Sequence, residues 1–225
     1  MEQYQREFID FMIRCGVLRF GEFTAKSGRQ TPYFIDTSRY TSGTQIESLG
    51  RYYAQAIERS GLQCDVLFGP AYKGIPLVVS TAIALKQEFG RDVDFCFNRK
   101  EAKDHGEGGV LVGRAPEPGM RVLILEDVTT AGTSIRETVP LLQRCGDITL
   151  AGLIVSVDRM ERGTGERAAL SELADTYRMP CQSIVSIAQI LQVLGAGHTV
   201  DGQTVLTPDQ HAAVLSYLQR YGGKP

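Results

Sequence analysis

The segment from 121 to 137, RVLILEDVTTAGTSIRE, constrains the fold more than any other part of the chain. It opens with four consecutive apolar residues, which suit a short strand buried on both faces of a sheet. Small and hydroxyl-bearing residues then form a turn, and the residues from Ile135 to Leu142 indicate the start of a helix. The segment therefore predicts a strand, a turn and a helix in close succession.

The turn in this segment has the composition of an anion site. The first N–H groups of a helix lack partners within it, and the helix dipole adds positive potential there. Thr and Ser hydroxyls can donate further hydrogen bonds to a phosphate. Glu126 and Asp127, directly before the turn, would repel a phosphate, but they suit the hydroxyls of a ribose. The segment indicates a ribose 5-phosphate site; the alternative is a strand, loop and helix that bind no ligand.

Two other nucleotide motifs do not fit this turn. A Walker loop needs a Lys after Gly132, and a dinucleotide fingerprint needs three Gly residues where this turn has one. The segment instead resembles, over its whole length, the phosphoribosyl-pyrophosphate (PRPP) signature of the type I phosphoribosyltransferases. That resemblance implies PRPP binding by Glu126, Asp127, Val128, Thr129, Thr130, Ala131, Gly132, Thr133 and Ser134.

Alternating strand and helix patterns predict an α/β fold with a mainly parallel central sheet flanked by helices. Strands are expected at 65–69, 92–98, 110–112, 148–157 and 183–185. Helices are expected at 2–15, 45–60, from the turn at 70–76 to about 89, at 165–177, at 187–194 and from about 208. Thr44 and Glu47 form a candidate capping box, and residues 18–41 are expected to be irregular. The resemblance implies one domain over 1–225, with a small hood mainly from about 1–40 and part of 160–225.

Composition limits the partners. A net charge of −2 gives no global field that recruits nucleic acid, so local cations must hold a polyanionic substrate. The five cysteines are scattered without a CxxC pair, which favours reduced thiols and a cytoplasmic location over a zinc site. The N-terminal residues are charged and no apolar run approaches about 20 residues, so we expect neither a signal peptide nor a membrane span.

A second candidate region is the segment 99–109, RKEAKDHGEGG. Its cations are nearly neutralised by three acids, so a solvated hairpin tip is a valid alternative. The segment resembles the catalytic loop of the orotate phosphoribosyltransferases at every position, and other type I families lack this sequence. The resemblance implies catalytic and PRPP-binding roles for Arg99, Lys100, Lys103 and His105.

The third region, 69–74, presents a Lys in the turn between a strand and a helix. On its own this Lys suits a solvated turn equally well. The segment is similar to the pyrophosphate loop of the family, which implies PRPP binding by Tyr72, a catalytic and PRPP-binding Lys73, and a cis peptide bond before Tyr72. By the same resemblance Lys26 contacts PRPP, and Phe34 and Ile35 line the orotate site.

Arg159 follows the strand predicted at 148–157, at the edge where α/β sheets bind ligands. Its guanidinium fork matches a carboxylate such as that of orotate, but a salt bridge with Asp158 or Glu161 is an open alternative. The resemblance implies that Arg159 and Thr130 contact orotate. His198 and His211 have no motif around them and are expected to be structural or surface residues.

Together these regions predict an enzyme that converts orotate and PRPP to orotidine 5′-phosphate and pyrophosphate. Mg²⁺ is expected as a cofactor held mainly by substrate oxygens and water, with no metal site made by the protein alone. The resemblance also implies a homodimer in which loop 99–109 is shared between subunits. Two alternatives remain: a phosphoribosyltransferase for another base, and a PRPP-sensing homologue without catalysis.

Overall fold

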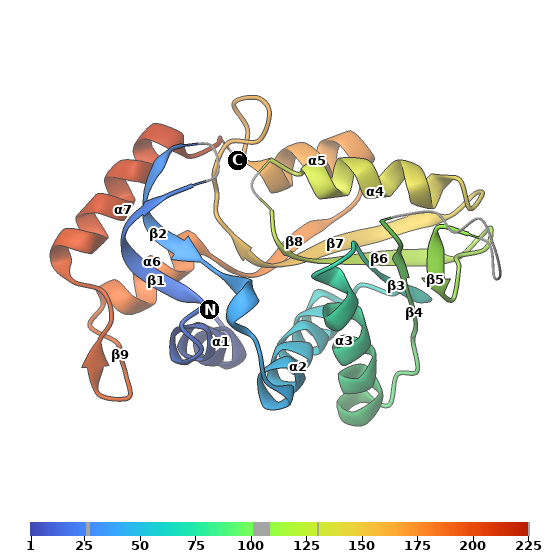
Figure 1. Ribbon diagram of the computed structural model, residues 1–225, viewed down its shortest axis with the longest axis horizontal. Coiled ribbons are helices and arrows are strands. Elements are labelled where there is room, and N and C mark those ends of the chain that lie inside the picture. The colour runs from blue at the N-terminus through green and yellow to red at the C-terminus, as the bar shows by residue number, and fades with distance from the viewer. Residues whose placement is uncertain (26–27, 101–108, 130, 225) are drawn as a thin grey trace.

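A single mixed sheet organises the fold, which the computed structural model describes for residues 1–25, 28–100, 109–129 and 131–224. Its strands are β3 (Val66–Gly69), β4 (Asp94–Asn98), β5 (Leu111–Gly113), β6 (Arg121–Val128), β7 (Thr149–Asp158) and β8 (Cys181–Ser186). Their order across the sheet is β5-β4-β3-β6-β7-β8, and only β5 runs antiparallel to its neighbour (Figure 1). The mainly parallel sheet predicted from the sequence is therefore confirmed.

Helices cover both faces of this sheet. The helices α4 (Thr133–Gln143) and α5 (Ala169–Tyr177) cover one face, and α2 (Gly43–Ser60) and α3 (Gly74–Phe89) cover the other (Figure 1). In β6, Val122 and Ile124 pack in the core with α4 and α5, whereas Leu123 and Leu125 pack in the core with α2 and α3. Successive strand side chains point to opposite faces, so a strand covered on both sides needs an uninterrupted apolar run.

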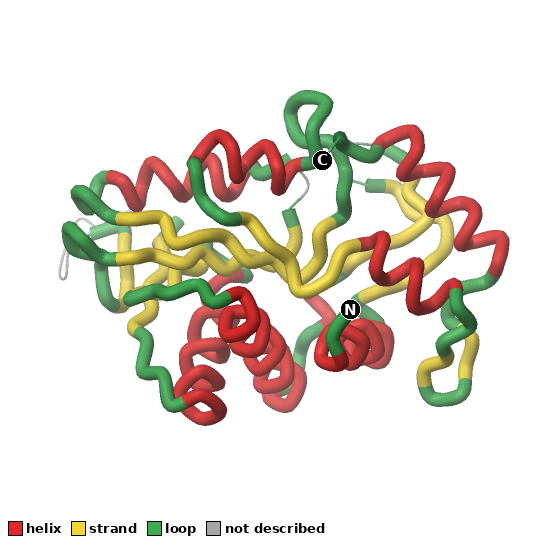
Figure 2. Tube along the Cα trace, turned by 180° about the vertical axis from the view of Figure 1, so that it is seen from behind, coloured by secondary structure: helices red, strands yellow, loops and turns green. Residues whose placement is uncertain are grey.

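An antiparallel hairpin lies at one end of the molecule, formed by β1 (Leu18–Thr24) and β2 (Gln30–Ile35). The short helix η1 (Thr37–Arg39) leads from it to α2, and α1 (Gln3–Arg14) precedes it. The helices α6 (Ile187–Gly195) and α7 (Pro208–Tyr221) lie on the same side of the molecule (Figures 1 and 2). The rings of Tyr33 in β2 and Tyr217 in α7 meet edge to face at 5.9 Å. That these segments form a hood over a ligand stays a prediction.

Two expectations for local structure were wrong, and one small element was not predicted. Residues 18–41 were expected to be irregular but contain the β1–β2 hairpin. The sequence pattern did not reveal it, because a register shift between Phe20 and Phe23 interrupts the alternation typical of strands. The capping box of α2 uses Ser42 and Gln45, not Thr44 and Glu47. The small hairpin of β9 (Thr199–Val200) and β10 (Gln203–Thr204) was not expected, since two-residue strands leave no periodic pattern.

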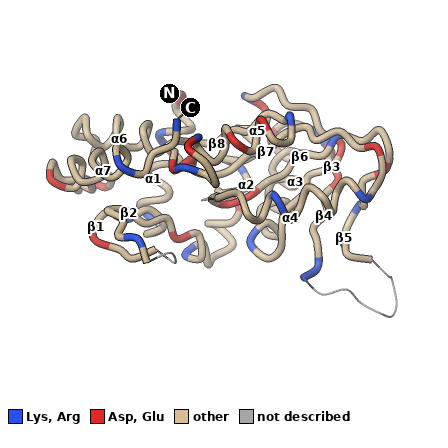
Figure 3. The backbone as a smooth tube through the Cα atoms, turned by 90° about the horizontal axis from the view of Figure 1, so that it is seen from above, with Lys and Arg blue, Asp and Glu red and all other residues tan. Residues whose placement is uncertain are grey.

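Two further features concern the distribution of charge and the lengths of the helices. Basic and acidic residues are interspersed over the elements that the structure describes (Figure 3). None of the helices in the described ranges has the length and hydrophobicity that a membrane span requires.

Candidate active site

The candidate residues gather at the carboxyl edge of the sheet. Lys73 follows β3, Glu126 and Asp127 lie near the C-terminal end of β6, and Arg159 follows β7. β3 and β7 each pair in parallel with β6, so the ends of these three strands lie at one edge. The sheet thus brings together, from three separate segments, an acid pair and two cations.

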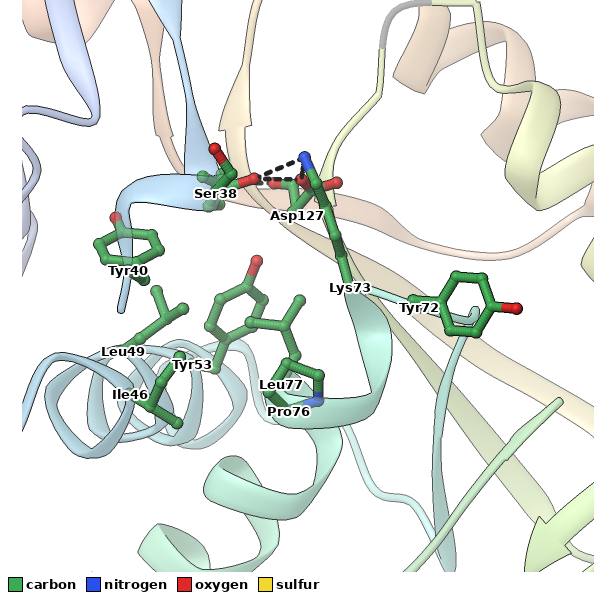
Figure 4. A pocket seen from close by; sticks show the side chains of 12 residues that line it. Ser38, Tyr40, Ile46, Leu49, Tyr53, Tyr72, Lys73, Pro76, Leu77 and Asp127 are labelled. Atoms are coloured by element: carbon green, nitrogen blue, oxygen red, sulfur yellow. Dashed lines mark hydrogen bonds and ion pairs between the residues drawn. The ribbon is translucent and has the colours of Figure 1, made fainter. Parts of the chain in front are cut away.

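Asp127 is the centre of a small polar network. Its Oδ2 accepts a hydrogen bond from Thr37 Oγ1 at 2.5 Å and pairs with Lys73 Nζ at 2.9 Å (Figure 4). Lys73 Nζ also donates to Thr37 Oγ1 at 2.9 Å. The Lys73 side chain is 59% exposed and that of Asp127 is 14% exposed. The cation can therefore reach solvent while the carboxylate stays largely within the protein.

The backbone beneath the acid pair is fixed by buried hydroxyls. Tyr53 donates to the carbonyl of Glu126 at 2.6 Å, and Ser156 donates to the carbonyl of Asp127 at 2.5 Å. The carboxylate of Glu126 accepts from the amide of Asp127 at 3.0 Å. Such bonds hold the two carboxylates in place without an external ligand.

The two acids differ in protonation. Burial and the neighbouring Asp127 charge raise the pKa of Glu126 to about 7. Burial would also raise the pKa of Asp127, but the bonds from Thr37 and Lys73 outweigh burial and lower it below its ordinary value. Asp127 is thus a carboxylate near neutral pH, and Glu126 gains or loses a proton there.

The turn after β6 directs the start of α4 toward this edge. Thr129 is buried, and its Oγ1 accepts a hydrogen bond from the amide of Gly132 at 3.0 Å. Gly132 has a left-handed φ of 74°, and a Cβ there would lie 2.9 Å from Leu173, so only glycine fits. Helix α4 then begins at Thr133, which presents its first amides beside the acid pair. Thr130 lies outside the described residues.

The turn before α3 is tightly folded. A Cβ on Gly69 would lie 2.1 Å from the carbonyl oxygen of Gly74, so these two backbones can approach only as glycines. The peptide bond between Ala71 and Tyr72 is cis, which confirms the expectation. The amide of Ala71 donates to the side chain of Asn98 in β4 at 2.9 Å. The turn that carries Lys73 is thereby joined to the strand that leads into segment 99–109.

Only the ends of that segment are described. The amide of Arg99 donates to the carbonyl of Val110 at 2.7 Å, and Lys100 is exposed. Residues 101–108, which include Lys103 and His105, lie outside the described residues, as does Lys26. The catalytic roles of Lys103 and His105 and the PRPP contact of Lys26 stay predictions.

A cavity of about 260 Å³ opens beside the Lys73–Asp127 pair (Figure 4). Its rim is polar, its floor is apolar, and the side chain of Tyr72 points outward from it. It is lined by Thr37, Ser38, Tyr40, Ile46, Leu49, Tyr53, Tyr72, Lys73, Pro76, Leu77, Asp127 and Ser156. Asp127 of the acid pair is thus open to a small molecule in this cavity, whereas Glu126 is buried and does not line it.

The proposed base-binding residues lie toward the hairpin. Arg159 donates through Nε and Nη2 to Glu161 Oε1, at 2.9 and 2.6 Å, so the alternative salt bridge with Glu161 is present. Phe34 stacks on Phe23 at 5.5 Å, and Ile35 is half-buried against the main core. These contacts explain the positions of the three side chains and leave their roles toward orotate untested.

Several contributors were missed because only the tertiary fold brings them to the site. Thr37, Tyr53 and Ser156 hold the acid pair from three other elements, and no local sequence signal marks them. His198, expected to be structural, contacts Asp10 at 2.7 Å far from this site. Among the described residues, no cluster of three His, Cys, Asp or Glu side chains could hold a metal ion.

Comparison with known sequences identifies the same region. The family described as the phosphoribosyl transferase domain matches residues 36–177. An orotate phosphoribosyltransferase of Lachnoclostridium phytofermentans is 50% identical over 223 residues, covering 99% of this chain and 99% of that protein. Another, of Pseudomonas aeruginosa, is 55% identical over 194 residues, covering 86% of this chain and 90% of that protein.

Solved structures agree. The orotate phosphoribosyltransferase of Francisella tularensis superimposes with a TM-score of 0.83 at 34% identity, covering 96% of this chain and 100% of that one. A Mycobacterium tuberculosis orotate phosphoribosyltransferase in complex with PRPP shares the fold, with a TM-score of 0.61 at 24% identity over 83% of this chain and 98% of that one. By sequence and by fold, the chain belongs to the orotate phosphoribosyltransferase family.

Proposed function

We propose that the protein transfers the 5-phosphoribosyl group of PRPP to orotate, which gives orotidine 5′-phosphate and pyrophosphate. The observation that carries this proposal is the acid pair of β6, set between the Lys73 turn and the first turn of α4. The acids suit the ribose hydroxyls, the helix start suits the 5-phosphate, and Lys73 suits the pyrophosphate. A mycobacterial protein of the same fold binds PRPP.

The chemistry needs no protein nucleophile. Departure of pyrophosphate leaves positive charge on the ribose, and orotate then bonds to the anomeric carbon. Catalysis is therefore electrostatic: the protein stabilises the leaving group, orients the base and excludes water. The cations assigned to the pyrophosphate are Lys26, Lys73, Arg99, Lys100, Lys103 and His105.

Mg²⁺ is the proposed cofactor. The described residues offer two adjacent carboxylates, and one of them is already paired with Lys73. This donor set fits an ion that binds one or two carboxylates and takes its other ligands from phosphates and water. Glu126 and Asp127 are the side chains that could contact it, and when bound it would neutralise charge on the pyrophosphate.

We also propose a cytoplasmic homodimer. All five cysteines are free, which suits a reducing compartment. Segment 99–109 connects β4 and β5 in the sequence, and the family resemblance assigns its cations to the active site of the neighbouring subunit. Each site of the dimer would then combine Asp127 of one chain with Lys103 of the other.

The direct test is loss of orotate absorbance in the presence of PRPP and Mg²⁺, with a panel of adenine, guanine, hypoxanthine and uracil in parallel. We expect consumption of orotate alone. Consumption of a purine in its place would support the alternative of another base. Tight PRPP binding without consumption of any base would support a PRPP-sensing protein. The variant Glu166→Gln, at an exposed surface pair with Lys224, is the control and should retain parental rates.

A further inference from the structure

Glu161 lies at the centre of a buried charge cluster that the reaction itself does not explain. Its side chain is 2% exposed, and its two oxygens accept from three side chains. Oε1 accepts from Arg159 and from the hydroxyl of Tyr33 at 3.1 Å, and Oε2 pairs with Arg29 Nη1 at 3.2 Å. Arg29 and Tyr33 belong to the β1–β2 hairpin region, whereas Arg159 follows β7. One carboxylate therefore joins two distant parts of the chain.

Two contacts hold the planar guanidinium of Arg159, one along its edge and one against its flat face. Glu161 takes the edge formed by Nε and Nη2, and the guanidinium lies 4.6 Å from the centre of the Tyr33 ring. The Arg159 side chain is 11% exposed, so few other orientations are open to it. Among the described residues, no hydrogen bond reaches Nη1 of Arg159. Nη1 is thus fixed in direction, and both of its N–H groups remain for a ligand.

The cluster also has a charge imbalance. Arg29 and Arg159 pair with the same carboxylate, and within the described ranges neither has a second acidic partner. The two guanidinium groups therefore carry one positive charge more than the carboxylate neutralises. Arg29 is 35% exposed and can be solvated, whereas Arg159 is 11% exposed, where an unmatched charge is costly. A ligand carboxylate would neutralise it, and a neutral base would not.

We propose that Glu161 is a positioning residue for substrate selection. It orients Arg159 Nη1 toward the carboxylate of orotate, and through Arg29 and Tyr33 it links that orientation to the position of the β1–β2 hairpin. This inference rests on the proposed function, because it takes orotate as the ligand of Arg159. Glu161 does not touch the substrate. It acts through Arg159, in the way that outer contacts orient the groups that bind a ligand.

The test compares kcat/KM for orotate and for PRPP in five proteins: the parent, Glu161→Gln, Arg159→Ala, the double variant and the surface control Glu166→Gln. Gln keeps the shape of Glu161 but turns an amide donor toward one of the two guanidinium groups. We expect Glu161→Gln to lower kcat/KM for orotate about tenfold, through KM rather than kcat, the size of one charged hydrogen bond. The value for PRPP should stay within about twofold of the parent.

The double variant separates positioning from general stability. If Glu161 acts through Arg159, the double variant should be no worse toward orotate than Arg159→Ala alone. Additive losses, or equal losses for PRPP and orotate, would overturn the inference. If Glu161→Gln does not fold, Tyr33→Phe removes only the hydroxyl that donates to Glu161 and should still weaken orotate selectively, and an unchanged KM there would overturn it too. A parent that uses another base refutes the proposed function instead, and the two failures are thereby distinct.

Discussion

Two ion pairs at the same edge of the sheet differ in how firmly they are held. In the Lys73–Asp127 pair the cation is mostly exposed, whereas in the Arg159–Glu161 pair both side chains are nearly buried. An exposed ammonium loses little when it exchanges a carboxylate for another anion. A buried pair that loses one partner leaves an uncompensated charge. The first pair is therefore suited to open when substrate binds, and the second to stay closed and hold a donor in place.

This contrast assigns the two pairs to different parts of the reaction. Lys73 pairs with Asp127, the acid proposed to bind the ribose, so we expect PRPP binding to separate these two side chains. In the proposed role, Arg159 keeps its contact with Glu161 and donates from Nη1 to the base. We thus expect the exchangeable pair to govern PRPP and the fixed pair to govern orotate.

The largest effects on rate should come from substitutions in the acid pair and in the loop 99–109 that we propose to be shared between subunits. Lys103→Ala should lose roughly 10²–10³ in rate as a preorganised charge on the leaving group. Asp127→Ala should have a comparable defect through the ribose. If the protein is the proposed homodimer with loop 99–109 shared between subunits, refolding the two variants together makes about half of the dimers mixed, and about a quarter of all sites should carry neither defect.

Activity of the refolded mixture measures this directly. Recovery to about a quarter of the parental rate supports sharing of loop 99–109. If subunit exchange is verified by mass and no activity returns, the loop acts within its own subunit.

The next effect separates the two ligands. Arg159→Ala should weaken orotate about tenfold to a hundredfold, the equivalent of roughly 1.5–3 kcal/mol for a charge-assisted contact. PRPP affinity should change little, because the residues proposed to bind PRPP lie at β6, at the start of α4 and in the Lys73 turn. Isothermal titration of each ligand measures both; equal losses would mean that Arg159 supports the architecture and does not select the base.

A smaller effect concerns Glu126 and pH. Its pKa is raised to about 7 by burial and by Asp127, so the folded state binds this proton more tightly than the unfolded chain does. Stability contributed by the bound proton is present at low pH and is lost as pH rises from about 4.3 to about 7. Glu126→Gln should therefore raise Tm relative to the parent above pH 7, by about 2–4 °C for each kcal/mol, and not at pH 4.

Thermal melts of the two proteins at pH 4, 6 and 8.5 provide this comparison. The difference in Tm should grow with pH. A constant difference would show that Glu126 keeps its ordinary pKa, and that Gln acts through packing instead.

The smallest effect should be that of Lys73 on stability. The Lys73 side chain is 59% exposed, and Thr37 still donates to Asp127 when Lys73 is replaced. The loss of Lys73 should therefore cost about 0–1 kcal/mol, and Lys73→Gln should shift Tm by less than about 4 °C. The matched substitution in the buried pair, Glu161→Gln, should shift Tm by more, because it leaves two guanidinium groups without a carboxylate. Equal shifts in differential scanning calorimetry would remove the distinction between the two pairs.

The sequence predicted where Lys73, Asp127 and Arg159 lie and offered the Arg159–Glu161 salt bridge as an alternative, but it did not predict the long-range contacts that hold the two pairs. The acid pair, Gly132 and the start of α4 are adjacent in sequence, so local composition and strand pattern are enough to place them. Lys73 also follows a predictable strand end. By contrast, Thr37 reaches Asp127 across 90 positions, and Tyr33 reaches Glu161 across 128. Contacts of that range depend on how the hairpin packs, and the hairpin itself was missed.

The fold shows the same division. The buried strands were predictable because both faces of the sheet demand apolar side chains. The β1–β2 hairpin has one face against the body and a register shift, so its pattern is weak. Arg159 illustrates the consequence: its position at a strand end was predictable, but its orientation depends on Tyr33 and Glu161.

A crystal structure with PRPP and Mg²⁺ bound tests the contrast between the two pairs most directly. The account predicts that Lys73 Nζ leaves the 2.9 Å contact with Asp127 for the pyrophosphate, and that Asp127 accepts from a ribose hydroxyl. It also predicts that Arg159 Nη2 stays near its present 2.6 Å from Glu161 Oε1. A bound PRPP with Lys73 still on Asp127, or with Arg159 turned away from Glu161, would contradict it.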